Sequence, residues 1–233
     1  MTLLTPHDAI GKYDAQKSVS LHKQYHPTCI QAIDIGANIG NYTIEFSQSF
    51  DSVIAFEPNK DICKKILDIP NCTLFHDAIS NSAGPVEYYK FEEINTVNTI
   101  NQAHAKWYEK KFDQKAERIS LQTSTIDSYN FTPCLIKIDV EGVQHKVLEG
   151  AINTILEHKP TLIVDCQMLG PKYNNFINAN KDDNDKMDDY SMLFDIGYVN
   201  MTEAIKLNKK ATDCFVHTSR IAEILVNSSD GRC

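Results

Sequence analysis

The stretch Asp34-Ile35-Gly36-Ala37-Asn38-Ile39-Gly40 decides the fold of this 233-residue chain. The segment 31–35 is a compact strand candidate, and the segment 41–48 has the pattern of a short helix. A strand, a glycine turn and a helix in this order are typical of an open α/β sheet that binds a ligand beyond the carboxyl ends of its strands. Glycine in such a turn lets the backbone approach a ligand closely, although a plain packing turn has the same pattern.

Short apolar runs continue to alternate with helix-length stretches on the carboxyl side of this turn. Helices are predicted at 59–67, where Asn59 is a good N-cap, and at 147–156, where apolar residues repeat at helical spacing. The residues 191–194 are predicted to be the end of a further helix. Further strands are predicted at 52–56, 73–75, 135–140, 161–164, 198–201 and 214–217. Alternating strands and helices, with nearly continuous apolar strands, predict a parallel sheet that is covered on both faces.

Two polar segments interrupt this alternation. The segments 85–91 and 118–125 alternate with period two, which predicts an antiparallel pair, and the polar stretch 92–117 between them has a helix candidate near 103–115. A long excursion between the third and fourth strands is typical of a lid or a substrate loop. The second segment, 174–189, is rich in Asn, Asp and Lys and is expected to be solvated and mobile. The predicted organisation is an N-terminal extension (1–29), one domain (30–218, with the insertion at about 85–125) and a C-terminal tail (219–233).

Composition and charge exclude several classes of protein. Hydrophobic residues make up 42% of the chain and charged residues 23%, which excludes a wholly disordered or collagen-like chain. No run of 18 apolar residues and no apolar leader segment occurs, so neither a membrane span nor a secretory signal is expected. The net charge of -8 disfavours a nucleic-acid partner, although a local basic groove is compatible with it.

Seven cysteines occur without a C-x-x-C pair, which argues against a zinc ribbon or a redox dithiol. We expect them to be small buried thiols in a reducing compartment, and hence a cytoplasmic protein.

The residues around the glycine turn favour one ligand class. A dinucleotide fingerprint fails at Asn38 and Asn41, and no G-K-[ST] triplet follows. Yet the second strand candidate ends in Glu57, whose carboxylate is suited to accept hydrogen bonds from both hydroxyls of a ribose. A ribose without a pyrophosphate points to S-adenosylmethionine, with Asp34 near the amino acid end of that ligand.

Three blocks of sequence resemble the FkbM family of S-adenosylmethionine-dependent methyltransferases over about residues 30–218. The blocks are IDIGANIGNYT (33–43), AFEPN (55–59) and LIKIDVEGVQHKVLEGA (135–151). The resemblance implies a class I methyltransferase (Rossmann-like) fold, with a doubly wound, mostly parallel seven-stranded sheet whose last strand is antiparallel and an insertion between strands 3 and 4. It also implies O-methylation of a hydroxyl, commonly on a carbohydrate or small metabolite. The cofactor-binding positions that it implies are Asp34, Gly36, Asn38, Gly40, Glu57, Pro58, Asn59, Asp77 and Ala78.

Candidate catalytic residues follow the fourth strand. Asp139 is the best candidate for a general base or hydroxyl acceptor, and Glu141 is able to share that role. The alternative for both acids is helix capping or charge pairing with Lys137. The family commonly has a further acid where this chain has Gln144, so a role that needs that carboxylate is in doubt. Substrate contacts are expected from His145 and, in the insertion, from Asn98, Thr99 and Trp107.

The predicted function is therefore S-adenosylmethionine-dependent O-methylation of a carbohydrate or small metabolite. The sequence shows no metal-ligand spacing, so no metal is expected, although the clustered carboxylates leave a divalent ion open. The alternatives are a methyltransferase acting on nucleic acid (an RNA cap or ribose) and a non-catalytic module that binds S-adenosylmethionine. The expected partner is a small molecule or glycan, without a membrane, and the oligomeric state is open.

Overall fold

The computed structural model describes residues 15–20, 22–24, 26, 28, 30–165, 190–201 and 212–221. Its main sheet has seven strands in the order β3-β2-β1-β7-β8-β10-β9. The strand bounds are Gln31–Ile35 (β1), Ser52–Phe56 (β2), Cys72–Phe75 (β3), Leu135–Ile138 (β7), Thr161–Asp165 (β8), Tyr198–Asn200 (β9) and Thr212–His217 (β10).

The strand directions confirm the predicted class I methyltransferase fold. The five strands from β3 to β8 are all parallel to their neighbours, whereas β10 is antiparallel to both β8 and β9. The chain turns back between β1 and β7, where the strand order reverses, and ligands bind at such a point in open α/β sheets.

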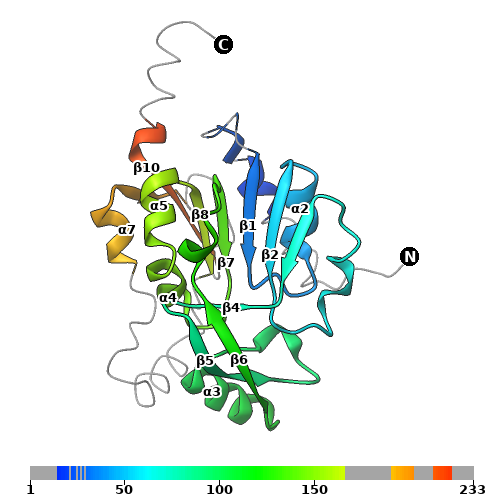
Figure 1. Cartoon of the computed structure of the whole chain (residues 1–233). Coiled ribbons are helices and arrows are strands. Elements are labelled where there is room, and N and C mark those ends of the chain that lie inside the picture. Colours follow the sequence, from blue (N-terminus) through cyan, green and yellow to red (C-terminus); the bar gives the residue numbers. More distant parts are fainter. Residues whose placement is uncertain are drawn as a thin grey trace, which may run out of the picture.

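Side chains alternate along each strand and so point to both faces of the main sheet, and each face is buried in its own apolar core. Ile33 belongs to one apolar core, together with residues of α4 (Gln144–Glu149) and α5 (Ile152–His158). Ala32 belongs to a second core, together with Phe46 of α2 (Asn41–Ser47). Figure 1 shows α4, α5 and α7 (Ser191–Asp195) near β7, β8 and β10, and α2 near β1 and β2.

A smaller sheet, built largely from the insertion, lies at one end of the main sheet (Figure 1). It contains β4 (Ala78–Ile79), β5 (Gly84–Lys90) and β6 (Glu117–Ser124) in the order β4-β6-β5. The predicted antiparallel pairing is confirmed, since Gly84–Lys90 pairs with Glu117–Thr123. Between β5 and β6 lie the short helix η2 (Asn95–Val97) and the helix α3 (Gln102–Phe112), whose N-cap is Asn101. Tyr89, Phe91 and Tyr108 form a separate small core under α3.

Two predicted helices differ from the observed ones. The helix predicted at 147–156 is divided at Gly150, where a Cβ atom would lie 2.1 Å from the carbonyl oxygen of Ser80, so the neighbouring chain occupies the space that a side chain would need. The helix predicted at 59–67 is reduced to the 3-10 turn η1 (Cys63–Lys65). Its start is held in a turn, because the amide of Asn59 donates to Glu57 while its own Oδ1 accepts from the amide of Asp61.

The cysteines follow the expectation only in part. Cys63 and Cys214 are buried free thiols, and Cys72 is a half-buried free thiol. Cys134 is disulfide-bonded, so the expectation of free thiols throughout is wrong at this position. The segment 174–189, for which mobility is predicted, lies outside the described residues. Within the described part of the chain, no helix has the length and apolar character needed to cross a membrane.

Candidate active site

A cavity lies between the carboxyl ends of β1, β2 and β7 and the small sheet. It comprises about 610 Å³ of space, part of which is open solvent. Ten of the predicted site residues line it: Gly36, Asn38, Glu57, Pro58, Asp77, Ala78, Asn98, Thr99, Asp139 and Glu141.

The glycine turn closes one side of the cavity and requires its glycines. Gly36 has φ +77°, and a Cβ atom there would lie 1.8 Å from the carbonyl oxygen of Asp139. The amides of Gly36 and Ala37 both donate to the carbonyl of Phe56, which fixes the turn against β2. Gly40 has φ +92° and forms the N-cap of α2, where a side chain would collide with Ile66. Gly40 is not among the lining residues.

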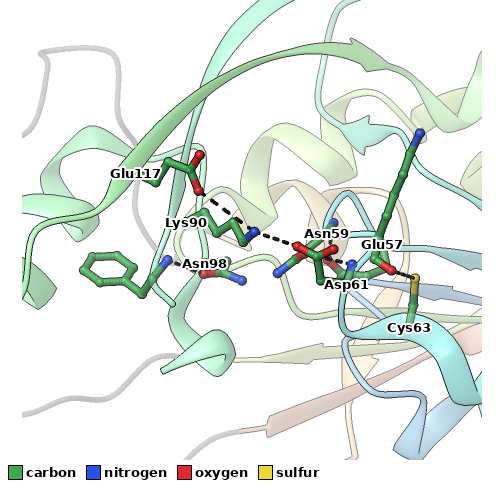
Figure 2. Close-up of polar contacts among 9 residues, drawn as sticks. Glu57, Asn59, Asp61, Cys63, Lys90, Asn98 and Glu117 are labelled. Atoms are coloured by element: carbon green, nitrogen blue, oxygen red, sulfur yellow. Dashed lines mark hydrogen bonds and ion pairs between the residues drawn. The ribbon is translucent and has the colours of Figure 1, made fainter. Parts of the chain in front are cut away.

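Glu57 is a buried carboxylate with both oxygens oriented by the backbone. Its Oε1 accepts from the amide of Asn59 at 2.8 Å, a contact visible in Figure 2, and its Oε2 accepts from the amide of Asn38 at 2.9 Å. Burial raises the pKa of Glu57 to about 7, although these two hydrogen bonds oppose the rise. Each carboxylate oxygen has more than one lone pair, so Glu57 retains the capacity to accept two hydroxyl donors.

Lys137 and Asp34 form a buried ion pair beside the cavity. Lys137 Nζ lies 3.1 Å from Asp34 Oδ1 and 3.7 Å from Asp139 Oδ2, and it donates to the carbonyl of Gly36 at 2.8 Å. Burial opposes the charge of Lys137, but these carboxylates outweigh burial and raise its pKa. Asp34 Oδ2 accepts from the hydroxyl of Thr43 at 2.6 Å, and Asp34 does not line the cavity. Asp34 therefore holds Lys137 and α2 in place, whereas the half-exposed Asp139 lines the cavity.

The turn after β7 presents Glu141 to the cavity with help from the insertion. Glu141 has a φ of 54°, which is uncommon for a residue other than glycine. The hydroxyl of Thr99 donates to the carbonyl of Glu141 at 2.6 Å, and Asn101 Nδ2 donates to the carbonyl of Gly142 at 2.9 Å. The hydroxyl of Tyr108, on α3, donates to Glu141 Oε2 at 3.0 Å. Three side chains of the insertion thus hold this turn in its unusual conformation.

Five predicted site residues, Asp34 and Gly40 among them, do not line the cavity. Asn59 is buried in the turn after β2, Trp107 packs in the small core under α3, and His145 is buried on α4. The departure at Gln144 has a structural explanation, since its amide Nε2 donates to the carbonyl of Asp165 at 3.1 Å. A carboxylate at this position is unable to make that bond.

Sequence reasoning also missed several lining residues, namely Tyr88, Ile100, Val140 and Val143. The period-two pattern of the segment 85–91 places alternate side chains on one face of a strand, but it does not say what that face covers. Within the described residues, no group of three His, Cys, Asp or Glu side chains is arranged to hold a metal ion.

Several solved structures are similar to part or most of this chain. A crystal structure of methyltransferase FkbM from Methylobacillus flagellatus is 17% identical, with a TM-score of 0.49, and the match covers 81% of this chain and 44% of that protein. An rRNA methylase from Streptococcus thermophilus is 13% identical (TM-score 0.40; 85% and 93% covered). A Streptococcus mutans protein described as a methyltransferase, in complex with SAH, is 14% identical (TM-score 0.40; 85% and 95% covered).

The comparison with protein families is more specific. Among the curated proteins no sequence matches the chain. The chain spans less than half the length of the Methylobacillus protein. The model of the methyltransferase FkbM domain matches residues 34–199, a span that contains every residue named above as lining the cavity. The chain therefore belongs to the FkbM domain family of S-adenosylmethionine-dependent methyltransferases.

Proposed function

We propose that this chain, through a domain of about residues 30–218, uses S-adenosylmethionine to methylate a hydroxyl group of a carbohydrate or small metabolite. The observation that carries the proposal is one cavity that joins two sets of groups. Glu57 and Asp77 follow β2 and β3, on one side of the strand-order reversal, and Asp139 and Glu141 follow β7, on the other.

The residues present fit the proposed cofactor. Glu57 is a buried carboxylate suited to the two hydroxyls of a ribose, and Asp77 lies at the end of the next strand outward, where a base attached to that ribose would extend. The opposite end of the ligand would then lie near Gly36 and Asp139. When bound, S-adenosylmethionine supplies an electrophilic methyl group.

The acceptor would enter on the side of β7 and the insertion. Asp139 is half-exposed and lies near the charge of Lys137, so it is available as an acceptor for the proton of a hydroxyl group. Asn98 and Thr99 line the same cavity and offer neutral polar groups, which suit a polyhydroxylated acceptor. A general base contributes about 10²–10⁴-fold to such reactions, and the positioning of the acceptor contributes further.

Methyl transfer measured from radiolabelled S-adenosylmethionine tests the proposal. The full chain is incubated with panels of sugars and glycans, small hydroxylated metabolites and RNA, and its affinity for S-adenosylhomocysteine is measured by calorimetry. We expect micromolar binding and labelling within the first two panels. Labelling confined to RNA would favour the nucleic-acid alternative. Binding without labelling of any panel would favour the non-catalytic module, and the absence of binding would reject the cofactor.

The cytoplasmic location stays a prediction, and the disulfide of Cys134 counts against it, because disulfides persist mainly in oxidising compartments. Alkylation of intact cells, followed by mass spectrometry of the Cys134 peptide, measures the thiol state directly. A fully alkylated Cys134 is the result expected in the cytoplasm.

A further inference from the structure

A tyrosine outside the cavity contacts one of the carboxylates that line it. Asp77 follows β3 and lines the cavity, and its Oδ2 accepts a hydrogen bond of 2.6 Å from the hydroxyl of Tyr129. Tyr129 is the last residue of the short helix η3 (Ile126–Tyr129) and lies 52 residues further along the chain. It is not one of the cavity-lining residues.

The ring of Tyr129 is held in place by three other aromatic rings. It stacks on Phe131, with ring centres 5.2 Å apart and planes inclined by 6°. It meets Phe56 and Phe75 at steep angles, with ring centres 5.3 and 5.2 Å away. The helix η3 is itself tied to α5, because Asp127 Oδ1 accepts from both the amide and the hydroxyl of Thr154. The direction of the Tyr129 hydroxyl is therefore determined by the packing of the main domain.

This contact matters because an aspartate side chain does not fix its own carboxylate plane. The last torsion of Asp is broad and roughly two-fold, so the orientation of its oxygens depends on a partner. The hydroxyl of Tyr129 uses one lone pair of Oδ2 and thereby orients the carboxylate toward the cavity that Asp77 lines.

We propose that Tyr129 is a positioning residue that sets the selectivity of the cofactor site for adenine by orienting Asp77. The inference rests on the proposed function, in which Glu57 binds the ribose and the base extends toward the end of β3. The exocyclic amino group of adenine is a hydrogen-bond donor, and a carboxylate in a fixed orientation is the matching acceptor. A base without that amino group gains nothing from the orientation.

Binding of two ligands to four proteins tests the inference without knowledge of the methyl acceptor. The ligands are S-adenosylhomocysteine and its analogue with hydrogen in place of the 6-amino group, and the Kd of each is measured by calorimetry. The proteins are the wild type, Asp77→Ala, Tyr129→Phe and the control Tyr198→Phe. Tyr129→Phe keeps the aromatic packing and removes only the hydroxyl. Tyr198→Phe removes a hydroxyl that donates to the carbonyl of Pro160, away from the cavity.

We expect the wild type and the control to bind S-adenosylhomocysteine at least tenfold more tightly than the analogue, and Asp77→Ala to bind both alike. Tyr129→Phe should reduce the preference at least threefold while the Kd of the analogue changes less than twofold. Equal weakening of both ligands in Tyr129→Phe would reduce Tyr129 to a structural role and overturn the inference, as would an unchanged preference. A wild type that binds S-adenosylhomocysteine without preferring the amino group overturns the inference alone, whereas a wild type that does not bind it rejects the proposed function as well.

Discussion

At the scale of single residues, burial makes the charge of Glu57 sensitive to pH near neutrality. Its pKa is raised from 4.5 to about 7, chiefly by burial, while Lys137 on β7 lowers it and Asp34 on β1 raises it further. Between these two pH values the folded protein holds a proton that the unfolded chain has lost. The free energy of unfolding therefore decreases as pH rises from about 4.5 to 7, by up to about 3 kcal/mol at this site.

The same ionisation should control the affinity for the cofactor. Two ribose hydroxyls donate to Glu57, so the ligand binds the ionised form preferentially, and affinity should rise as pH increases through 7. We expect the Kd of S-adenosylhomocysteine to fall about fivefold or more between pH 6 and pH 8. Calorimetry of the Glu57→Gln variant with the same ligand is the control, since titration of the ligand itself is common to both proteins. A wild-type Kd that is equal at the two pH values would exclude Glu57 as the ribose acceptor.

Asp139 belongs to the reaction rather than to cofactor binding in the proposed function. Replacement by Asn removes the proton acceptor while it preserves size, so turnover of an acceptor identified by the labelling screen should fall about 10²-fold or more. The Kd of S-adenosylhomocysteine should stay within about threefold of the wild type. Asp51→Asn, at an exposed aspartate, is the matched control. Unreduced turnover in Asp139→Asn would remove this residue from the mechanism.

At the scale of elements, the helix α3 supports the turn that follows β7. Its N-cap Asn101 bonds to Gly142, and Tyr108, two turns further along the helix, bonds to the carboxylate of Glu141. The carboxylate of Glu141, a proposed catalytic group, therefore follows a strand of the main sheet and is held by a helix of the insertion.

The Tyr108 hydroxyl should accordingly affect the chemical step through Glu141. A hydrogen bond to a charged group contributes about 1.5–3 kcal/mol, so Tyr108→Phe should lower kcat by about tenfold. The KM for S-adenosylmethionine should not change, because Tyr108 does not line the cavity. Steady-state kinetics of Tyr89→Phe provide the control, since that hydroxyl donates to Glu87 on its own strand. A proportional rise in KM without a change in kcat would contradict the assignment.

At the scale of the whole molecule, the small sheet is tied to the main sheet by two sets of contacts. One set joins it to the turn of Glu141. The second set centres on Lys90, at the end of β5. Its Nζ lies 2.7 Å from Oδ2 of Asp61, in the loop after β2, and 3.9 Å from Oε2 of Glu117 on β6 (Figure 2). Because the Asp61 side chain is 74% exposed, this pair contributes little stability.

These contacts favour a wall that exists before any ligand binds, in place of the lid that is one of the two expectations for the insertion. Hydrogen exchange of the free protein should show the amides of α3 protected to an extent comparable with those of α5. Addition of S-adenosylhomocysteine together with an acceptor should change this protection little. Rapid exchange of α3 in the free protein, with new protection only when both ligands are present, would support the lid and contradict the preformed wall.

Local patterns were sufficient to predict the mostly parallel sheet and the approximate positions of its strands, although the strand predicted at 135–140 ends at Ile138. Apolar runs indicate the strands, and the carboxyl ends of parallel strands meet at one edge of a sheet. Glu57 and Asp139 follow two such strands, the family resemblance adds Asp77, and all three line one cavity. The close approach of Ser80 to Gly150, where the predicted helix is divided, was not predictable, because it comes from a distant part of the chain.

Neighbours along the chain were enough to predict the order of the elements, the family and the carboxylates that follow the strands. The orientation of those carboxylates became visible only in the folded structure. Asp34 is turned away to a buried ion pair, Glu141 is held by Tyr108 from 33 residues before it, and Asp77 is held by Tyr129 from 52 residues after it. The physical reason is that the direction of a side chain depends on partners that packing brings from distant segments, and such partners leave no periodic signal in the sequence.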